Sequence, residues 1–332
     1  MEEKIDFVIT WVDGNDKKWQ EEKRQYETQS TEEDKGEKRY RDWENLRYWF
    51  RGVEKFAPWV NCIYFVTYGH LPNWLNCNHP KLKVVNHKEF IPKEYLPTFN
   101  SNTIDLNLHR IEGLSEKFVY FNDDTFLIDF VKPKDFFYQG KPCDSCILSP
   151  IISIDRDGFA KVQQNNMMII NTNFDKKQSI KQNRKKWFCL RYQISLLRTL
   201  CLMPWKHFAG FYETHLPHGY CKKTFQEVWE KEYEIINKTC LDKFRNNNTN
   251  VNQWLMRYWR MVKGEFYPRN LKFGTMFLYE DNNEKMYQAI KKQKYKVVCL
   301  NETDKKYDFE KEKEKTKIAF ETILPQKSSF EK

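Results

Sequence analysis

The chain has 332 residues, of which 40% are hydrophobic and 16% aromatic, so it can bury a large core in one elaborated domain or two. Its 56 basic and 46 acidic residues give a formal net charge of +10, which favours anionic partners: nucleotide sugars, phosphodiester polymers, nucleic acid or an acidic membrane surface. A nucleic-acid-binding protein is disfavoured, because no RRM, KH or helix-turn-helix signature is present and basic residues are mostly mixed with acidic ones.

Short apolar runs that alternate with helical patterns predict a largely parallel α/β sheet. In the first half we expect a helix that carries Leu46, Trp49 and Val53, and strands at 7–12, 63–67, 82–85 and 118–121. A hairpin around 155–158 and a strand at 167–171 are expected next. The later elements are helices at 222–233, 251–262 and 284–292, strands at 273–278 and 296–300, and a charged tail from Thr303 that is helical or mobile.

The start of the chain and its cysteines both predict a cytoplasmic protein. Met1 and the two glutamates after it lead directly into a strand-like run, without the apolar stretch of a secretory signal. Nine cysteines at irregular spacing are typical of thiols in a reducing compartment rather than of a disulfide framework. Cys143 and Cys146 have metal or redox spacing, but no second such pair accompanies them.

The first strand ends in a polar turn that runs from Trp11 to Asp16. It contains Asp13, Gly14 and Asn15, and the glycine permits close approach of a ligand to the backbone. An aspartate directly after the first strand of an α/β sheet can bond a ribose or a base edge. On spacing alone, a plain turn is the favoured interpretation of these residues.

Residues 97–124 contain the densest set of candidate site residues. A polar helix start and a helix with Asp105, His109 and Arg110 lead to an apolar strand that ends in Asp123 and Asp124. Carboxylates at the carboxyl end of such a strand face the crevice where open α/β sheets bind ligands. Helical periodicity alone supports a plainer interpretation, in which the neighbouring apolar side chains pack and Asp105 and His109 are exposed.

The order of these segments resembles the Stealth family, which includes bacterial capsular and exopolysaccharide phosphotransferases and the animal N-acetylglucosamine-1-phosphotransferase. Four sequence blocks carry the resemblance, at 5–16, 39–127, 214–259 and 296–303. The third block begins with THLPHG and the fourth is KVVCLNET. The resemblance implies a mostly parallel, Rossmann-like (GT-A-like) sheet flanked by helices, with a helical second lobe.

The resemblance also implies a catalytic set of Asp105, Asp124, His215 and Arg245. Relatives usually have glutamate at the position of Asp105. The aspartate side chain is one methylene shorter than that of glutamate. Imidazole titrates near neutral pH, so His215 can accept a hydroxyl proton, whereas the permanently charged Arg245 can bind phosphoryl oxygens.

Substrate and metal binding are expected around the same segments. The expected substrate-binding residues are Trp11, Asp13, Gly14, Asn15, Asp16, Asn100, Ser101, Arg110 and Asp123. Two carboxylates that converge near a diphosphate repel each other unless a cation lies between them. We therefore expect Asp105 and Asp124 to hold Mg²⁺ or Mn²⁺.

The stretch 181–206 carries seven basic residues and no acidic one, with apolar residues at helical spacing. It is too short and too charged to span a bilayer, but it can rest on an anionic membrane. The alternative is a core helix with a solvated basic face, or a groove for the acceptor.

These observations predict a phosphotransferase that moves a sugar-1-phosphate from a UDP-sugar, or another nucleotide sugar, to a glycan hydroxyl and releases UMP. The product is phosphodiester-linked capsular polysaccharide or exopolysaccharide, made in the cytoplasm or at the inner face of the cell membrane. An enzymatic alternative is a metal-dependent glycosyltransferase that releases UDP. A remote alternative is a non-enzymatic basic nucleic-acid-binding protein.

The expected organisation has four parts. A nucleotide-sugar-binding α/β core occupies 1–171, and a mainly helical section with the third block occupies 172–270. Strands and a helix return to the core at 271–302, and the charged tail follows at 303–332.

Overall fold

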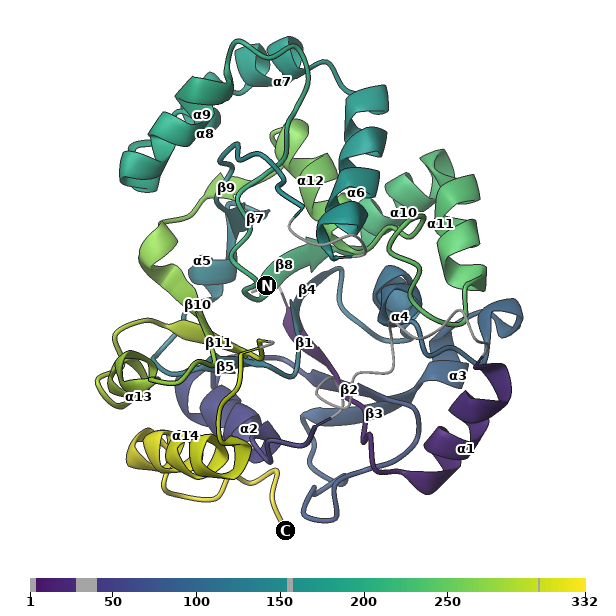
Figure 1. Cartoon of the computed structure of the whole chain (residues 1–332), viewed down its shortest axis with the longest axis vertical. Helices are drawn as coiled ribbons and strands as arrows, with labels where there is room; N and C mark the ends of the chain where they lie inside the picture. Colours follow the sequence, from purple (N-terminus) through teal and green to yellow (C-terminus); the bar gives the residue numbers. More distant parts are fainter. Residues whose placement is uncertain (1–3, 28–40, 154–157, 304) are drawn as a thin grey trace.

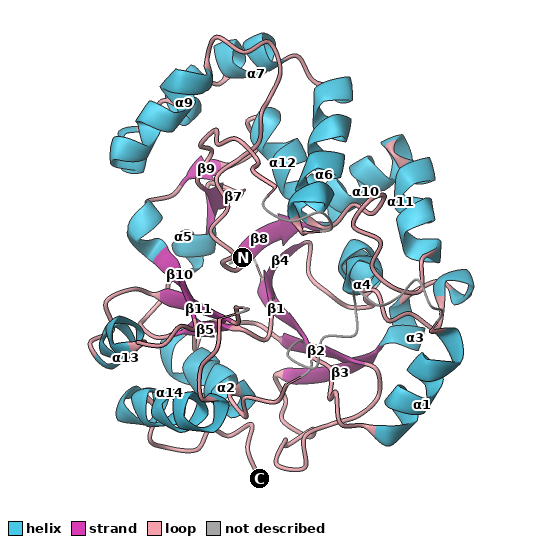
Figure 2. Ribbon diagram, viewed as in Figure 1, coloured by secondary structure: helices cyan, strands magenta, loops and turns pink. Residues whose placement is uncertain are grey.

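The computed structural model describes residues 4–27, 41–153, 158–303 and 305–332, and Figures 1 and 2 show a central sheet flanked by helices. Five strands form this sheet in the order β3-β2-β1-β4-β8. They are β1 (Ile5–Thr10), β2 (Ile63–Thr67), β3 (Leu82–Asn86), β4 (Lys117–Phe121) and β8 (His218–Cys221). The first four run parallel and β8 is antiparallel to β4, which confirms the predicted mostly parallel α/β fold.

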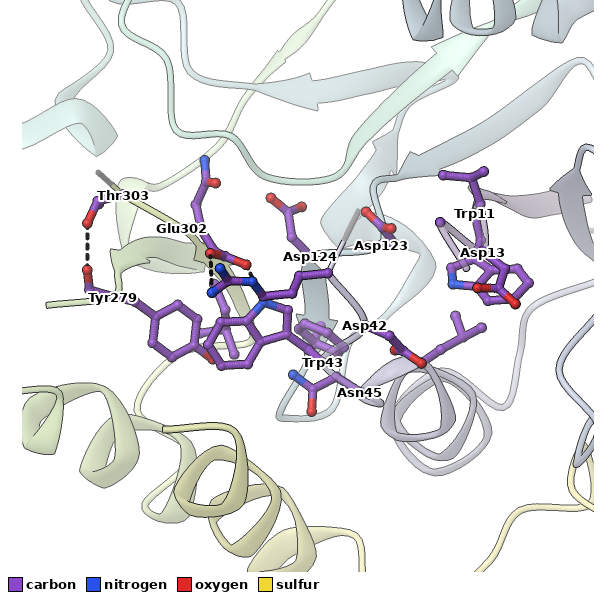
Figure 3. A pocket seen from close by; sticks show the side chains of 17 residues that line it. Trp11, Asp13, Asp42, Trp43, Asn45, Asp123, Asp124, Tyr279, Glu302 and Thr303 are labelled. Carbon is purple, nitrogen blue, oxygen red and sulfur yellow. Dashed lines mark hydrogen bonds and ion pairs between the residues drawn. The ribbon is translucent and has the colours of Figure 1, made fainter. Parts of the chain in front are cut away.

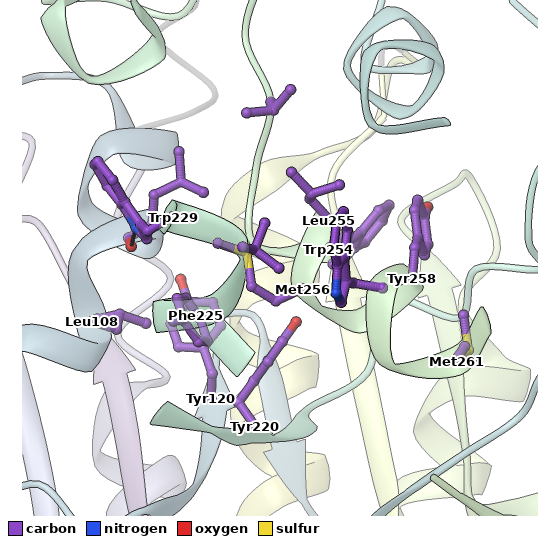
Figure 4. Packing of buried hydrophobic residues seen from close by; sticks show 14 of the residues in the cluster. Leu108, Tyr120, Tyr220, Phe225, Trp229, Trp254, Leu255, Met256, Tyr258 and Met261 are labelled. Carbon is purple, nitrogen blue, oxygen red and sulfur yellow. Dashed lines mark hydrogen bonds between the residues drawn. The ribbon is translucent and has the colours of Figure 1, made fainter. Parts of the chain in front are cut away.

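The parallel strands are apolar along most of their length because helices cover both faces of the sheet. In β1, Phe7 and Ile9 point into one buried cluster and Val8 into the other. The first cluster lies under α2 (Leu46–Phe56), α13 (Glu284–Lys291) and α14 (Phe309–Ile323). The second packs against α4 (Ser101–Asn107) and the helices of residues 160–262, and Figure 4 shows its aromatic side chains around Trp229 and Trp254.

Helix α2 lies unusually close to the sheet and to the C-terminal helix. A Cβ at Gly52 would meet the carbonyl oxygen of Leu127 at 2.8 Å, so only glycine permits this approach of α2 to strand β5 (Thr125–Leu127). On its other side, Tyr48 stacks on Phe320 of α14 with ring centroids 5.3 Å apart. The predicted charged tail is therefore a packed helix.

Two three-stranded sheets extend the core. One has the order β10-β11-β5, and β11 pairs antiparallel with β5. The other has the order β6-β7-β9. Their strands are β5 (Thr125–Leu127), β6 (Phe137–Tyr138), β7 (Lys141–Asp144), β9 (Tyr267–Pro268), β10 (Gly274–Leu278) and β11 (Val297–Asn301).

Most residues between 160 and 262 are helical. The helices are α6 (Ala160–Asn173), α7 (Lys176–Gln182), α8 (Arg184–Trp187), α9 (Leu196–Leu202), α10 (Lys222–Lys231), α11 (Tyr233–Leu241) and α12 (Trp254–Val262). Shorter or peripheral helices elsewhere are α1 (Lys17–Tyr26), α3 (His87–Phe90) and α5 (Pro133–Phe136). The expected strand at 167–171 is wrong, because these residues form part of α6.

The hairpin expected around 155–158 is also wrong on its second side, since α6 begins at Ala160; residues 154–157 lie outside the described part. The proposed domain boundary at residue 171 falls inside α6. The division of the chain into four parts stays a prediction.

Candidate active site

A cavity of about 410 Å³ opens beside the carboxyl ends of β1, β4 and β11 (Figure 3). Its lining comes from the turns after β1 and β4, the segment before α2, and the end of β11. The lining residues are Trp11, Val12, Asp13, Gly14, Arg41, Asp42, Trp43, Asn45, Leu46, Asp123, Asp124, Phe126, Tyr279, Leu300, Asn301, Glu302 and Thr303. This position agrees with the ligand crevice of open α/β sheets.

The polar turn after β1 is fixed by hydrogen bonds. The backbone N–H of Asp13 donates to Nε2 of His70 over 2.7 Å, and the N–H of Asn15 donates to Oδ1 of Asp13 over 2.9 Å. Asp16 is the N-cap of α1 and accepts from the N–H of Trp19. Asn15 and Asp16 thus shape the turn, while Asp13 and Gly14 line the cavity.

His70 was missed by the sequence analysis. Burial lowers its pKa, which favours the neutral imidazole that accepts the hydrogen bond from Asp13. The charges of Asp16 and Asp13 act in the opposite direction but do not reverse this shift.

An aromatic wall closes one side of the cavity, and its residues were also missed. Trp43 stacks on Tyr279 with ring centroids 4.1 Å apart, and its indole N–H donates to Oε1 of Glu302 over 2.8 Å. The hydroxyl of Tyr307 donates to the other oxygen of Glu302. Trp43 and Glu302 lie in the second and fourth blocks, but nothing in their local spacing indicates that they meet.

A second, smaller pocket is lined by Tyr120, Asn122, His215 and Trp254 among others. Nε2 of His215 is 3.3 Å from Oδ2 of Asp124, and the amide nitrogen of Asn122 is 3.1 Å from the same Nε2. His215 has a φ of 47°, a conformation that costs a non-glycine residue energy and that is often found at functional sites. The pair of Asp124 and His215 links this pocket to the larger cavity.

The environment of His215 determines its protonation. Burial lowers its pKa, but the hydrogen bond and charge of Asp124 more than offset this, so the pKa is raised above its usual value. Oδ2 of Asp124 also accepts from Sγ of Cys299 over 3.4 Å, whereas the buried Oδ1 has no hydrogen-bond partner. An unpartnered buried carboxylate oxygen is a natural ligand for a cation.

Asp124, His215 and Cys299 form a candidate metal group, because one ligand atom from each lies within 4.8 Å of the others. Within the described residues, no group of three or more candidate ligands includes Asp105. Carboxylate and imidazole ligands suit a divalent cation, and thiolate shifts the preference toward softer metals.

Asp105 has a different environment from the one expected. It is buried, and its Oδ1 accepts a hydrogen bond from the hydroxyl of Tyr120 over 2.7 Å. The oxygen of that hydroxyl is also 2.9 Å from Oγ1 of Thr10. Burial raises the pKa of Asp105 to about 7, although the Tyr120 hydrogen bond lowers it. The plainer interpretation is wrong on exposure, since Asp105 and His109 are both buried.

The start of α4 brings together three other predicted residues. Asn100 is its N-cap, is fully buried, and donates to Oδ1 of Asn250 over 2.9 Å. Nε of Arg245 donates to the hydroxyl of Ser101 over 2.8 Å, so a predicted catalytic residue meets a predicted substrate-binding one. Arg110 lies apart from them and stacks over Trp229 at 4.9 Å.

Comparisons with known proteins bear on this arrangement. The family models Stealth protein CR1, conserved region 1, and Stealth protein CR2, conserved region 2, match residues 3–31 and 39–144. The capsular polysaccharide phosphotransferase WcwK of Streptococcus pneumoniae is 47% identical over 332 residues, which cover 99% of this chain and 98% of that protein. The receptor polysaccharide phosphotransferase WefC of Streptococcus gordonii is 42% identical over the full length of both chains.

These full-length matches place the chain in the class of polysaccharide phosphotransferases. The chain belongs to the Stealth family. A solved structure of the galactosyltransferase LgtC, in complex with donor and acceptor sugar analogs, covers 98% of both chains at 12% identity and a TM-score of 0.41. A likeness this low carries no argument about function.

Two further expectations concern the rest of the molecule. Cys143 and Cys146 are buried free thiols, and neither belongs to the candidate metal group. Across the described ranges, no helix is both long and apolar enough to cross a bilayer.

Proposed function

We propose that the protein transfers a sugar-1-phosphate from a UDP-sugar, or another nucleotide sugar, to a hydroxyl of a glycan acceptor in capsular polysaccharide or exopolysaccharide synthesis. The observation that carries this proposal is the pair of His215 and Asp124, 3.3 Å apart, beside a cavity of about 410 Å³. That volume lies within the range of small-molecule sites, and the full-length phosphotransferase relatives support the same chemistry.

The bond changes in this reaction are as follows. The acceptor oxygen forms a bond to the sugar-bearing phosphorus, while the bond from that phosphorus to the bridging anhydride oxygen breaks. His215 takes the hydroxyl proton, and the electron pair of the broken bond leaves on the nucleoside monophosphate. Asp124 orients the imidazole and stabilises its protonated form.

The charge of the cavity supports a requirement for Mg²⁺ or Mn²⁺. Five carboxylates line the described part of the cavity, against one basic side chain, Arg41, which already lies 3.9 Å from Glu302. A diphosphate would be repelled by this lining unless a cation neutralised it. Asp124, with its unpartnered Oδ1, is the residue that would hold the cation, while His215 and Cys299 border it and the imidazole stays available as the base.

Two other predicted catalytic residues have supporting roles in the proposal. Arg245 is attached to Ser101 at the start of α4, where its guanidinium can bind phosphoryl oxygens of the donor. Asp105 acts through Tyr120, whose side chain lines the pocket of His215. We further propose that the protein works in the cytoplasm at the inner face of the cell membrane.

The reaction is tested by product analysis. Purified protein with a panel of nucleotide sugars and a glycan acceptor should yield the nucleoside monophosphate and a new phosphodiester, both visible by ³¹P NMR. Release of the nucleoside diphosphate would show attack at the anomeric carbon and would assign the protein to the metal-dependent glycosyltransferases instead.

The cation is tested separately. Rigorous chelation should abolish turnover, and Mg²⁺ or Mn²⁺ should restore it. Electron paramagnetic resonance of added Mn²⁺ identifies the ligands without relying on activity: Asp124→Asn should weaken binding, whereas Asp105→Asn should leave it nearly unchanged. Loss of Mn²⁺ binding in Asp105→Asn would identify Asp105 as a ligand of the cation.

A further inference from the structure

The outer surface of residues 190–205 carries an exposed apolar ridge. Among the described residues, six of the 18 exposed large hydrophobic side chains fall within these 16 positions. The ridge consists of Leu190, Ile194, Leu197, Leu200, Met203 and Trp205. Leu190 and Ile194 are the most exposed of them, at 85% and 76%. The exposure of these side chains contradicts the core helix that was one alternative for this segment, whereas a groove for the acceptor stays a prediction.

The ridge is exposed although its backbone is firmly attached to the core. On the inner side of α9, Thr199 is fully buried and its hydroxyl accepts from the N–H of Leu148 over 3.1 Å. Leu196 and Leu202 pack against the larger core, and Lys176 donates to the carbonyl oxygen of Trp205 over 2.7 Å. The outward apolar face is therefore a fixed feature of the fold.

Basic residues flank the ridge in the sequence. The segment 181–206 contains seven basic residues and no acidic one. Lys181, Arg184, Lys185 and Lys206 are exposed, and within the described ranges none of them is ion-paired with a carboxylate. Figure 1 shows that α7, α8 and α9 lie at the end of the molecule far from the C-terminus.

We infer that the ridge and its flanking cations dock the protein on an anionic lipid bilayer. Apolar side chains that enter the boundary between headgroups and acyl chains, flanked by lysine and arginine, are the two components of peripheral membrane binding. A second copy of the chain is a poorer occupant, since two such surfaces would bring their unpaired cations together. This inference does not depend on the proposed phosphotransfer.

The ridge is connected to the candidate active site by one short segment. Leu148, whose N–H bonds Thr199 of α9, forms a β-bridge with Phe211, and the N–H of Tyr212 donates to the carbonyl oxygen of Ile147 over 2.9 Å. Three residues after Tyr212 comes His215. Docking would therefore hold the lobe that carries His215 at the membrane surface.

Sedimentation of the full chain with vesicles tests this inference. We expect binding to vesicles of mixed phosphatidylglycerol and phosphatidylcholine, and little binding to phosphatidylcholine alone. Arg184→Gln with Lys185→Gln should weaken binding about tenfold or more, because each basic residue near an anionic surface contributes roughly fivefold. Leu197→Ser with Leu200→Ser should weaken it by a similar factor.

The matched controls change residues in the region of α13 and in α14. Lys291→Gln with Lys292→Gln removes two exposed charges from the region of α13, and Ile318→Ser removes an apolar side chain of α14 that is 47% exposed. Neither should alter vesicle binding, and all variants should keep the circular dichroism and melting temperature of the parent protein.

Three outcomes overturn the inference. The first is equal sedimentation with neutral and anionic vesicles. The second is unchanged binding both in folded Arg184→Gln with Lys185→Gln and in folded Leu197→Ser with Leu200→Ser. The third is a concentration-dependent dimer, detected by analytical ultracentrifugation, that Leu197→Ser with Leu200→Ser dissociates while vesicle binding is absent. That result would assign the ridge to a second copy of the chain.

Discussion

Two clusters of ionisable side chains contact the segment 213–218, and they differ in burial and in their ion pairs and hydrogen bonds. At one end, Arg257 and Arg260 bind Asp144, and Arg257 also binds Glu213. In the middle, His215 binds Asp124. The side chains of Asp144 and Arg257 are 0% exposed, whereas those of His215 and Asp124 are 26% and 24% exposed.

The difference separates a structural role from a chemical one. Asp144 receives hydrogen bonds from both arginines, and although burial raises its pKa, the charge of Arg257 brings the value well below the usual range. Asp124 keeps an unpartnered oxygen beside a cavity. Asp144, whose two oxygens both accept hydrogen bonds, helps to hold the fold together, whereas Asp124, whose Oδ1 has no partner, can bind a ligand.

The largest expected effect is on folding, and it comes from Asp144→Asn. The change keeps the shape but removes the carboxylate that Arg260 binds and leaves Arg257 with Glu213 alone, which should lower the free energy of unfolding by about 3–5 kcal/mol. Urea denaturation measures this. Glu280→Gln, which breaks the exposed ion pair with Lys305, is the control and should cost less than about 1 kcal/mol. Equal effects of the two changes would contradict the comparison.

Asp105 is a buried carboxyl without an arginine, so it should respond to pH in the opposite sense from Asp144. Its folded pKa of about 7 exceeds the ordinary value of 3.8, so its contribution to stability is complete below about pH 4 and is lost as the pH rises to about 7. Asp105→Asn retains an acceptor for Tyr120 and should remove this loss, which amounts to about 4 kcal/mol at pH 8. Parallel stability curves of the two proteins between pH 4 and 8 would contradict a neutral, buried Asp105.

His215→Ala should reduce turnover by roughly 10² or more, the usual scale for loss of a general base, and should change the melting temperature little. Arg245→Ala should act similarly through the loss of charge stabilisation. His207→Ala, which removes an exposed histidine, is the matched control for activity. Near-native rates in folded His215→Ala, with the correct donor, would reject this histidine as the base.

The smallest effect is a shift in the pKa of His215, measured by NMR titration of its ring protons. In the parent protein Asp124 holds this pKa above the usual value, so activity that needs the neutral imidazole should fall as the pH drops through it. In Asp124→Asn, burial still lowers the pKa of His215, while the hydrogen bond to a charged Asp124 that raised it is lost. The pKa should therefore drop below that of the parent protein. An unchanged or higher pKa would show that Asp124 does not control His215.

The order of strands and helices was predictable from the sequence, because runs such as 63–67 and 118–121 are apolar and bounded by polar turns. The error at 167–171 has a physical cause. This run lies inside the 14-residue helix α6, in which Met167, Ile169 and Ile170 are buried while Met168 is 57% exposed. Five residues are too few to distinguish the 3.6-residue period of a helix from the two-residue period of a strand.

The site was predictable in part. Asp123 and Asp124 followed from their place after an apolar strand, and the family resemblance pointed to His215, which the structure brings to Asp124. The stacking of Trp43 on Tyr279 was not predictable, because the two rings are 236 positions apart and no local pattern connects them. The contact of Asp105 with Tyr120 depends on how α4 packs on β4, which periodicity does not specify.

The position of β1 in the middle of the sheet has a consequence for folding kinetics. Ile5 pairs with Lys117 of β4, and Leu127 of β5 pairs with Val297 of β11, so each pairing closes a loop of more than 100 residues. Contacts between such distant positions form slowly, because the loss of chain entropy precedes any gain from packing. The same pairings bring the turn after β1, Asp124 and Cys299 to one edge of the sheet. Recovery of activity during refolding should therefore follow the slowest phase, after most helical signal has returned.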